Sequence, residues 1–457
     1  MEELYDTVAA VSTPHGEGGV GVIRISGAEA TAIADRVFSA RDKKKLAKGR
    51  GYSLRLGTVF ADGEAVDDAL ALLFRAPKSY TGEDVVELQC HGGPVALSRV
   101  LRALVDAGAR IAAEGEFTRR ALLNGRVTLT EAEGIANIIS AVSRQGEAAA
   151  YAQSNGVLFR ETERIKGDIL ALQSAIAAWI DFPEEDVQPV DDVRMTGQLQ
   201  MLREALQTLV DSYETGLLVL HGLRAAIVGS PNVGKSTLMN LLTGYDSAIV
   251  APTAGTTRDV IENRIRFGGT ALLLADTAGI RVTGDAVEQI GVSRALRRME
   301  QSDLVFAVFD GSRLLADDDR DLISRLAGRR VIALINKSDL PQVLDAREIE
   351  AVFEHTLCIS AVDPVSFAIL EDAVTRYLGI NNFSPNAPVL TNERQRSAAV
   401  RALSAVDEAL AALEDGLTPD VVFISLDEAL GAILELSGER VSDAVLDEVF
   451  SRFCVGK

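Results

Sequence analysis

The sequence predicts a multidomain protein of α/β and α type, in which a doubly wound α/β domain is inserted into an all-α helical domain. The chain has 457 residues, which exceeds the roughly 100–200 residues of a single domain. Two segments, 121–219 and 385–457, share a helical pattern and an excess of acidic residues. Between them, residues 220–384 alternate short apolar runs with helical patterns, which is typical of a parallel sheet covered by helices.

The two flanking segments are expected to form one helical domain. They carry 7 and 6 basic residues against 15 and 13 acidic residues, and so hold most of the net charge of −20. Apolar residues recur at three- and four-residue spacing, for example at Leu170, Ile176 and Ile180. About 70 residues of amphipathic helix seldom form a core alone. One split domain is therefore favoured over two separate bundles, with a proline-containing run at 381–388 marking the return from the insertion.

The inserted domain opens with a phosphate-binding pattern. An apolar strand is expected over Ala225–Val228, followed by Gly229-x-x-x-x-Gly234-Lys235-Ser236 and a helical segment. This strand–loop–helix order is that of a P-loop, whose backbone N–H groups bind phosphate oxygens. The lysine is expected to contact the β- and γ-phosphates, and the serine to bind Mg²⁺. The P-loop residues expected to contact the nucleotide are Asn232, Val233, Gly234, Lys235, Ser236 and Thr237.

Two later motifs indicate which nucleotide binds. The D-x-x-G pattern at 276–279 places a carboxylate near Mg²⁺ and a glycine N–H near the γ-phosphate. The sequence Asn-Lys-Ser-Asp at 336–339 follows the apolar run VIALI, and its final carboxylate can accept two N–H bonds that guanine offers and adenine does not. A P-loop GTPase domain is therefore expected. Its further nucleotide-binding residues are predicted to be Asp276, Thr277, Ala278, Gly279, Asn336, Lys337, Asp339, Ser360 and Ala361.

A switch-type loop lies between these motifs. Residues 255–259 read Gly-Thr-Thr-Arg-Asp, and Thr257 can bind Mg²⁺ only while the γ-phosphate is present. The residue after the D-x-x-G pattern is Ile280, where a glutamine would orient the attacking water. Because isoleucine cannot do this, hydrolysis requires another polar group.

Composition excludes several classes of protein. No run approaches the roughly 20 apolar residues that span a bilayer, and the acidic N-terminal stretch MEELYD lacks the order of a secretory signal. Three cysteines far apart in sequence favour a reducing cytoplasm over a disulfide framework. The excess of acidic residues argues against broad binding of nucleic acid. Cys454 is expected to be a partly buried, unreactive thiol.

The motifs together resemble a known family. The sequences GSPNVGKS, GTTRD, DTAG and NKSD, with GGVGVIRISG and GEFTRRALLNGR near the start and FCVGK at the end, are similar in order to the MnmE (TrmE) family of bacterial tRNA-modification GTPases. This resemblance covers the whole chain. It implies four parts: an α+β folate-binding and dimerisation domain at 1–120, the two helical pieces at 121–219 and 385–457, and the G domain at 220–384.

The resemblance also implies a function. It indicates a cytoplasmic homodimer that forms a heterotetramer with an MnmG-type, FAD-binding partner; the FAD belongs to that partner. Together they install an aminomethyl or carboxymethylaminomethyl group at C5 of the wobble uridine of tRNA, using a formyl-tetrahydrofolate-type one-carbon carrier. GTP hydrolysis in the family is stimulated by K⁺, which stabilises the charge that spreads over the phosphates.

The resemblance assigns further residues. Glu288 corresponds to the glutamate that orients the attacking water, and Lys235 is the second catalytic residue. The K⁺ ligands are Asn232, Ala251, Thr253 and Thr256, within a nucleotide-binding loop that also contains Pro252, Ala254, Gly255 and Thr257. The folate carrier is assigned to Arg24, Glu87, Arg126 and Lys457, although family members often have lysine at the position of Arg126. A carboxylate can accept N–H bonds from a pterin, and the cations suit folate carboxylates.

Two other functions fit parts of the sequence. One is a regulatory RNA-associated GTPase, such as a ribosome-assembly factor, although no strongly basic segment flanks the G domain. The other is a folate-dependent one-carbon transferase whose G domain serves only in dimerisation.

Overall fold

The computed structural model describes residues 6–14, 16–181, 192–244, 262–275, 302–380 and 383–457. The chain divides into two compact units. One comprises Met1–Ala136, Gln153–Arg203 and Ala398–Lys457, and the other comprises Asn137–Ala152 and Glu204–Ser397. Among the described helices, none is both long and apolar enough to cross a membrane.

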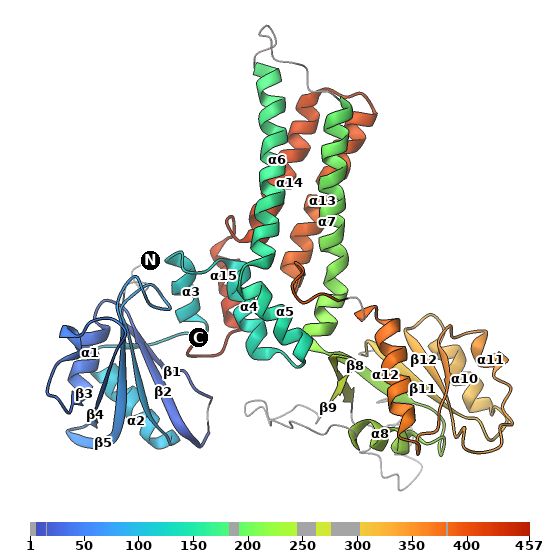
Figure 1. Ribbon diagram of the computed structural model, residues 1–457, viewed down its shortest axis with the longest axis horizontal. Helices are drawn as coiled ribbons and strands as arrows, with labels where there is room; N and C mark the ends of the chain where they lie inside the picture. Colours follow the sequence, from blue (N-terminus) through green and yellow to red (C-terminus); the bar gives the residue numbers. More distant parts are fainter. Residues whose placement is uncertain (1–5, 15, 182–191, 245–261, 276–301, 381–382) are drawn as a thin grey trace. The chain divides into compact units, whose positions relative to one another are not determined.

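The first unit begins with a mixed seven-stranded sheet (Figure 1), whose strand order is β3-β4-β5-β6-β2-β1-β7. Most neighbours are antiparallel; β7 runs parallel to β1. The strands are β1 (Val8–Val11), β2 (Gly18–Ser26), β3 (Phe38–Ala40), β4 (Ser53–Ala61), β5 (Glu64–Phe74), β6 (Val85–Gly92) and β7 (Arg110–Ile111). The helices beside them are α1 (Ala30–Val37), α2 (Pro94–Asp106) and α3 (Glu116–Leu123).

The two faces of this sheet differ. Alternate residues of β2, such as Ile23 and Ile25, pack with α1 and α2 in a buried apolar core, as the period of two in a strand requires. On β4 the same alternation leaves Leu54, Leu56 and Phe60 exposed by 57%, 41% and 38%. Apolar side chains therefore gather on the face that does not contribute to the core.

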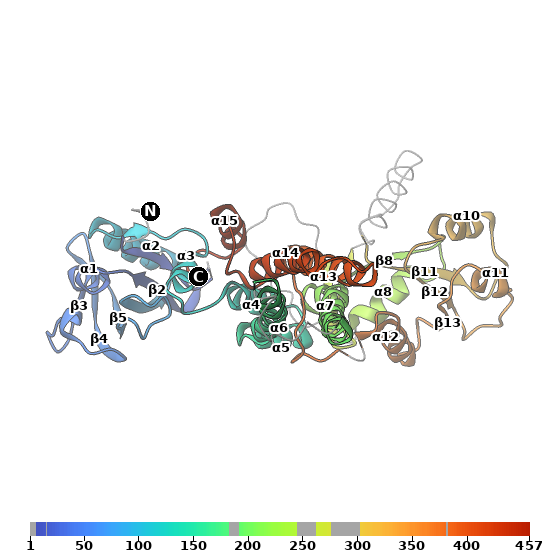
Figure 2. The ribbon, with the colours of Figure 1, turned by 90° about the horizontal axis from the view of Figure 1, so that it is seen from above.

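The helical part of the first unit contains chain segments from before and after the inserted domain. Helix α6 (Val157–Asp181) lies beside α14 (Pro419–Ser437), as Figures 1 and 2 both show. Lys166 of α6 forms an ion pair of 2.8 Å with Glu439, just beyond α14. Segments separated by more than 200 residues thus share one bundle. The other helices of the chain's helical part are α4 (Leu129–Ser140), α5 (Arg144–Ser154), α7 (Asp192–His221), α13 (Glu393–Glu414) and α15 (Asp443–Ser451).

The second unit contains a six-stranded sheet of order β13-β12-β11-β8-β10-β9. All neighbours are parallel except β9 and β10. The strands are β8 (Leu223–Val228), β9 (Glu262–Phe267), β10 (Thr270–Ala275), β11 (Leu304–Asp310), β12 (Val331–Asn336) and β13 (Thr356–Cys358), and the helices are α8 (Lys235–Gly244), α10 (Asp317–Leu326), α11 (Arg347–Glu350) and α12 (Val365–Tyr377).

Both faces of this sheet are buried. Strand β11 has no exposed residue, and separate apolar clusters lie on its two sides, one containing Phe306 and the other Phe309. Continuous apolar strands are what a doubly wound parallel sheet requires. The predicted fold class is confirmed. The strand before the P-loop begins at Leu223, two residues earlier than expected, and the four domain boundaries stay a prediction.

Candidate functional site

The P-loop lies where the sequence places it, between β8 and α8. Gly234 has φ +102°, and a Cβ at this position would lie 2.2 Å from Nδ2 of Asn336. At Gly229 a Cβ would lie 2.4 Å from the carbonyl oxygen of Val308. Asn232 between them also has a positive φ of 64°. The two motif glycines are therefore required by close approach of neighbouring atoms, and the loop curves tightly between them.

One buried asparagine joins three loops of this site. Asn336, at the end of β12, is 3% exposed. Its Nδ2 donates to the carbonyl oxygen of Val233 over 2.8 Å, and its Oδ1 accepts from the backbone N–H of Ala361 over 2.9 Å. The P-loop, the Asn-Lys-Ser-Asp segment and the loop after β13 are thus held together at the carboxyl edge of the parallel strands, where such sheets bind ligands.

The side chains expected to contact guanine are arranged on this frame. Ser360 donates its hydroxyl to Oδ1 of Asp339 over 2.6 Å, while Asp339 itself is exposed. Lys337 has φ +65°, and its Nζ lies 2.6 Å from Oδ2 of Asp310. Burial would raise the pKa of Asp310, but the Lys337 ammonium and the hydroxyl and backbone N–H of Ser312 keep it below its usual value. The carboxylate of Asp339 is oriented by its serine partner and open to a ligand.

The phosphate end of the site contains Lys235. Its Nζ donates to the carbonyl oxygens of Gly229 and Ser230 over 2.8 and 2.7 Å, and burial lowers its pKa. Ser236, in the first turn of α8, is exposed. An exposed hydroxyl beside an ammonium at a helix N-terminus fits a phosphate with its Mg²⁺.

Several predicted residues lie outside the described residues. They are Ala251, Pro252, Thr253, Ala254, Gly255, Thr256, Thr257, Asp276, Thr277, Ala278, Gly279 and Glu288. Of the predicted nucleotide site, the described residues thus include the P-loop and the base-binding loops. The switch loop, the D-x-x-G motif and the glutamate expected to orient water stay predictions.

A second polar cluster lies in the first unit, around Arg24. Arg24 of β2 and Glu87 of β6 are paired across the two strands, and Nε of Arg24 lies 2.9 Å from Oε1 of Glu87. The guanidinium also lies 5.3 and 5.4 Å from the ring centres of Tyr80 and Phe117, within the range of cation–π attraction. These two aromatic residues were not predicted, because single aromatic residues give no signal in one sequence.

The C-terminal tail reaches the same cluster. Nη1 of Arg24 donates to the carbonyl oxygen of Gly456 over 3.4 Å, and the N–H of Phe117 donates to the carbonyl oxygen of Lys457 over 3.1 Å. Burial, followed by repulsion from Arg24, lowers the pKa of Lys457. Three of the four residues assigned to the folate carrier are therefore close together.

Two expectations about this region need qualification. Arg126 is exposed, its N–H donates to the carbonyl oxygen of Ala121 over 2.8 Å, and a Cβ at Gly82 would lie 3.3 Å from its Cγ; no contact with Arg24 is described. The expectation of a partly buried Cys454 is wrong, since this residue is exposed. The tail pairs with Glu114 at Val455, and Phe453 and Gly456 are the residues that it buries.

Comparisons with known proteins identify the family. A model described as "MnmE helical domain" matches residues 129–454, and one described as "GTP-binding protein TrmE N-terminus" matches residues 7–126. Curated proteins called "tRNA modification GTPase MnmE" are similar over 99% of this chain and 99% of their own length, with 38% identity in Acetivibrio thermocellus and 40% in Heliobacterium modesticaldum. The chain belongs to the MnmE family of tRNA modification GTPases.

Among solved structures, the G domain of the FeoB iron transporter of T. maritima is 24% identical and covers 34% of this chain and 98% of its own, with a TM-score of 0.26. Era of Aquifex aeolicus, bound to GDP and AlF₄⁻, is 26% identical over 40% of this chain and 66% of its own, with a TM-score of 0.25.

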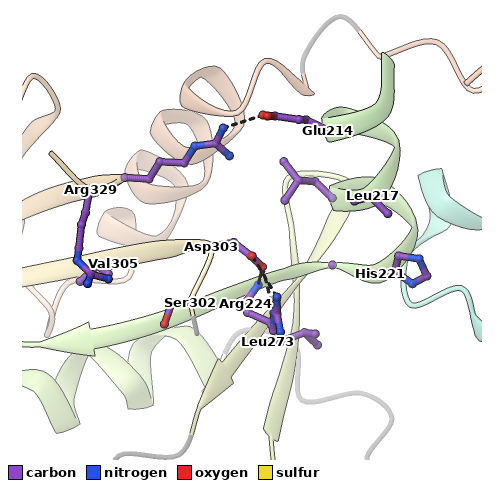
Figure 3. A pocket seen from close by; sticks show the side chains of 12 residues that line it. Glu214, Leu217, His221, Arg224, Leu273, Ser302, Asp303, Val305 and Arg329 are labelled. Atoms are coloured by element: carbon purple, nitrogen blue, oxygen red, sulfur yellow. Dashed lines mark hydrogen bonds and ion pairs between the residues drawn. The ribbon is translucent and has the colours of Figure 1, made fainter. Parts of the chain in front are cut away.

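This MnmE-family chain has a further cavity, of about 690 Å³, beside the amino-terminal ends of strands β8 and β11 (Figure 3). Its lining charges form ion pairs: Glu214 of α7 with Arg330 over 2.7 Å, and Arg224 of β8 with Asp303 over 3.3 Å. Exposed pairs of this kind contribute about 0–1 kcal/mol each. The first pair links the last turns of α7 to the sheet, and the second joins β8 to the residue before β11, both at the edge opposite the P-loop.

Proposed function

We propose that this chain is a K⁺-stimulated GTP hydrolase that, with an FAD-binding partner, modifies C5 of the wobble uridine of tRNA. The modification is an aminomethyl or carboxymethylaminomethyl group, and a formyl-tetrahydrofolate-type carrier donates the carbon. The observation that carries the proposal is the pair of Asn336 hydrogen bonds, which hold a phosphate-binding loop and a guanine-selective loop together. Membership of a family of tRNA modification GTPases supports tRNA as the molecule that is modified.

The proposed roles in hydrolysis are those that the sequence motifs and the family resemblance assign, and the described contacts of Lys235 and Asp339 support two of them. Lys235, already directed at the P-loop by two carbonyl oxygens, binds the β- and γ-phosphates. Asp339 accepts the N–H groups of guanine. Ser236 and Thr257 hold Mg²⁺, and Glu288 orients the attacking water in place of the missing glutamine. These residues together bind the triphosphate and exclude adenine.

K⁺ is proposed to bind at Asn232, with oxygens from Ala251, Thr253 and Thr256. The curved backbone at Asn232 and its exposed side chain are compatible with a cation ligand beside the phosphates. When bound, the cation supplies positive charge where negative charge develops during hydrolysis.

The folate carrier is proposed to bind at Arg24, Glu87 and Lys457, with Arg126 contacting its distal carboxylates. The Glu87 carboxylate suits the N–H groups of a pterin, and the cations suit the carboxylates of the carrier. The two rings beside Arg24 offer apolar surface to a planar ligand. The carrier supplies the one-carbon unit; this chain's residues bind and orient it.

The partners are a second copy of the chain and the MnmG-type flavoprotein, in a heterotetramer. Homodimerisation through the N-terminal domain is supported by the exposed apolar side chains of β4, because apolar side chains gathered on one face are typical of an interface. The acidic helices are proposed to bind the flavoprotein, which provides the basic surface for tRNA. The proposed location is the cytoplasm.

Reconstitution with the flavoprotein tests the proposal. GTP turnover and wobble-uridine modification would be measured together, by phosphate release and by mass spectrometry of the tRNA, in KCl and in NaCl of equal concentration. We expect both to fall at least about tenfold in NaCl, because the charge-stabilising cation is lost. Asn232→Ala should lose the difference between the salts, whereas Asn240→Ala, an exposed residue of α8, should keep it.

Three results would contradict the proposal. Equal turnover in both salts would remove the role of K⁺. Modification that persists with Asp276→Asn, a variant designed to lack GTP hydrolysis, would favour a folate-dependent transferase with a structural G domain. Unmodified tRNA together with copurification on ribosomal particles would favour a ribosome-assembly GTPase.

A further inference from the structure

A buried carboxylate outside the nucleotide motifs contacts the P-loop. Asp319, in the first turn of α10, is 1% exposed. Its Oδ1 accepts from the hydroxyl of Ser230 over 2.5 Å. Ser230 is the second residue of the P-loop motif, which begins at Gly229. One charged oxygen of α10 therefore holds the P-loop by a side-chain bond.

The bond continues to the lysine that contacts phosphate. The carbonyl oxygen of Ser230 accepts from Nζ of Lys235 over 2.7 Å. The position of Ser230 therefore helps to fix where this ammonium lies. Ser230 therefore connects Asp319 to the Lys235 ammonium, the group expected to bind the β- and γ-phosphates.

Asp319 is itself fixed in place. Its Oδ2 accepts from Nη1 of Arg313 over 2.7 Å and from the N–H of Ala316 over 2.9 Å. The bond to Ala316 closes the start of α10, a common role for an acidic residue at this position. Burial would raise the pKa of Asp319, but Arg313, Ser230 and the N–H of Ala316 keep it low. The carboxylate is charged at neutral pH.

The turn that fixes Asp319 also contacts the base-binding loop. The N–H of Gly311 donates to the carbonyl oxygen of Asn336 over 2.9 Å. Asp310 receives the ammonium of Lys337. Residues 310–319 thus contact the guanine end of the site at one end and the phosphate end at the other.

We propose that Asp319 is a positioning residue for guanine-nucleotide binding, acting through the Ser230 hydroxyl on the P-loop and Lys235. If Asp319 only stabilised the start of α10, its bonds to Arg313 and Ala316 would be sufficient. The Ser230 bond serves the loop instead, because it restrains the backbone that must curve around phosphate. This inference rests on the proposed nucleotide site.

The test is a double-mutant cycle on the full chain, with the dissociation constant for GDP as the readout. Ser230→Ala removes one hydroxyl and Asp319→Asn removes the charge. Each substitution is expected to raise the dissociation constant for GDP about tenfold, which corresponds to the loss of one hydrogen bond to a charged group. The double variant should bind GDP no more weakly than the weaker-binding single variant, because both changes act on the same charge-assisted hydrogen bond. Ser230→Thr keeps a hydroxyl and should retain most of the affinity.

The outcomes distinguish a failure of the proposed function from a failure of the positioning role of Asp319. Wild-type protein that does not bind GDP would contradict the proposed function. If the wild type binds GDP and Ser230→Ala binds equally well, or the two losses add, the positioning role is wrong. Thermal unfolding without nucleotide identifies a structural effect: Ser230→Ala should leave that transition nearly unchanged while its GDP affinity falls.

Discussion

At the scale of single residues, the three cysteines differ in the environment of their thiols. Cys90, on β6, is 3% exposed, and burial together with the nearby Asp67 carboxylate raises its pKa to about 12. Cys358 and Cys454 are exposed. Because the thiolate is the reactive form, a raised pKa lowers reactivity at neutral pH.

We therefore predict that a thiol reagent at pH 8 modifies Cys358 and Cys454 quickly and Cys90 only after unfolding. At that pH the thiolate fraction of Cys90 is about 10⁻⁴, and its burial slows access further. Counting the modified thiols in native and in urea-unfolded protein checks this. Cys358→Ser should remove one fast thiol. Rapid modification of Cys90 in the native protein would show that β6 opens readily.

At the scale of elements, the ends of two helices use glycine for different reasons. Gly438 follows α14 with φ +91°, and a Cβ there would lie 2.3 Å from Cβ of the buried Leu129 at the start of α4. Gly416, after α13, has φ +69° but no atom within 4 Å of the added Cβ. Both positions strain an L side chain, and only the first also lacks space.

These two glycines separate backbone strain from packing. We predict that Gly416→Ala lowers the free energy of unfolding by about 1 kcal/mol, from the left-handed backbone alone. Gly438→Ala should cost about 2–4 kcal/mol, because the methyl group also displaces Leu129. Urea unfolding of both variants measures the difference. Equal losses would mean that α4 moves away from α14 at little cost.

At the scale of the whole molecule, local sequence patterns predicted helices, strands and loops better than they predicted contacts between residues far apart in the sequence. The helical period indicated the bundle, and the P-loop glycines indicated the turn between β8 and α8. The meeting of Val233, Asn336 and Ala361 followed from the rule that parallel strands end at one edge. The pair of Arg24 and Glu87 could not be derived from spacing. It depends on the antiparallel register of β2 and β6, and the two residues are 63 positions apart in the sequence.

The Asp319 contact lay beyond sequence reasoning for a related reason. It joins α10 to Ser230 across 89 positions, and an aspartate in a helical first turn is ordinarily a cap. Only the fold reveals that one of its oxygens points to the P-loop. Sites built from motifs can thus be predicted, while the residues that position them depend on nonlocal packing.

Because the chain divides into two units, we predict two unfolding transitions, each of which a different ligand shifts to higher temperature. The nucleotide site lies within one unit and the Arg24 cluster within the other, and a ligand that binds only folded protein stabilises the unit that binds it. GDP at about 100 times its Kd should stabilise one unit by about 2.7 kcal/mol. 5-Formyltetrahydrofolate should raise the other transition and leave the first unchanged.

Differential scanning calorimetry of the full chain measures both transitions in one experiment. ADP at the same concentration is the control, and it should shift neither transition because Asp339 would lack its guanine partners. The Arg24→Ala variant should lose the response to 5-formyltetrahydrofolate and keep the response to GDP. A single transition that both ligands raise equally would mean that the two units unfold as one cooperative structure, coupled more strongly than their separate cores indicate.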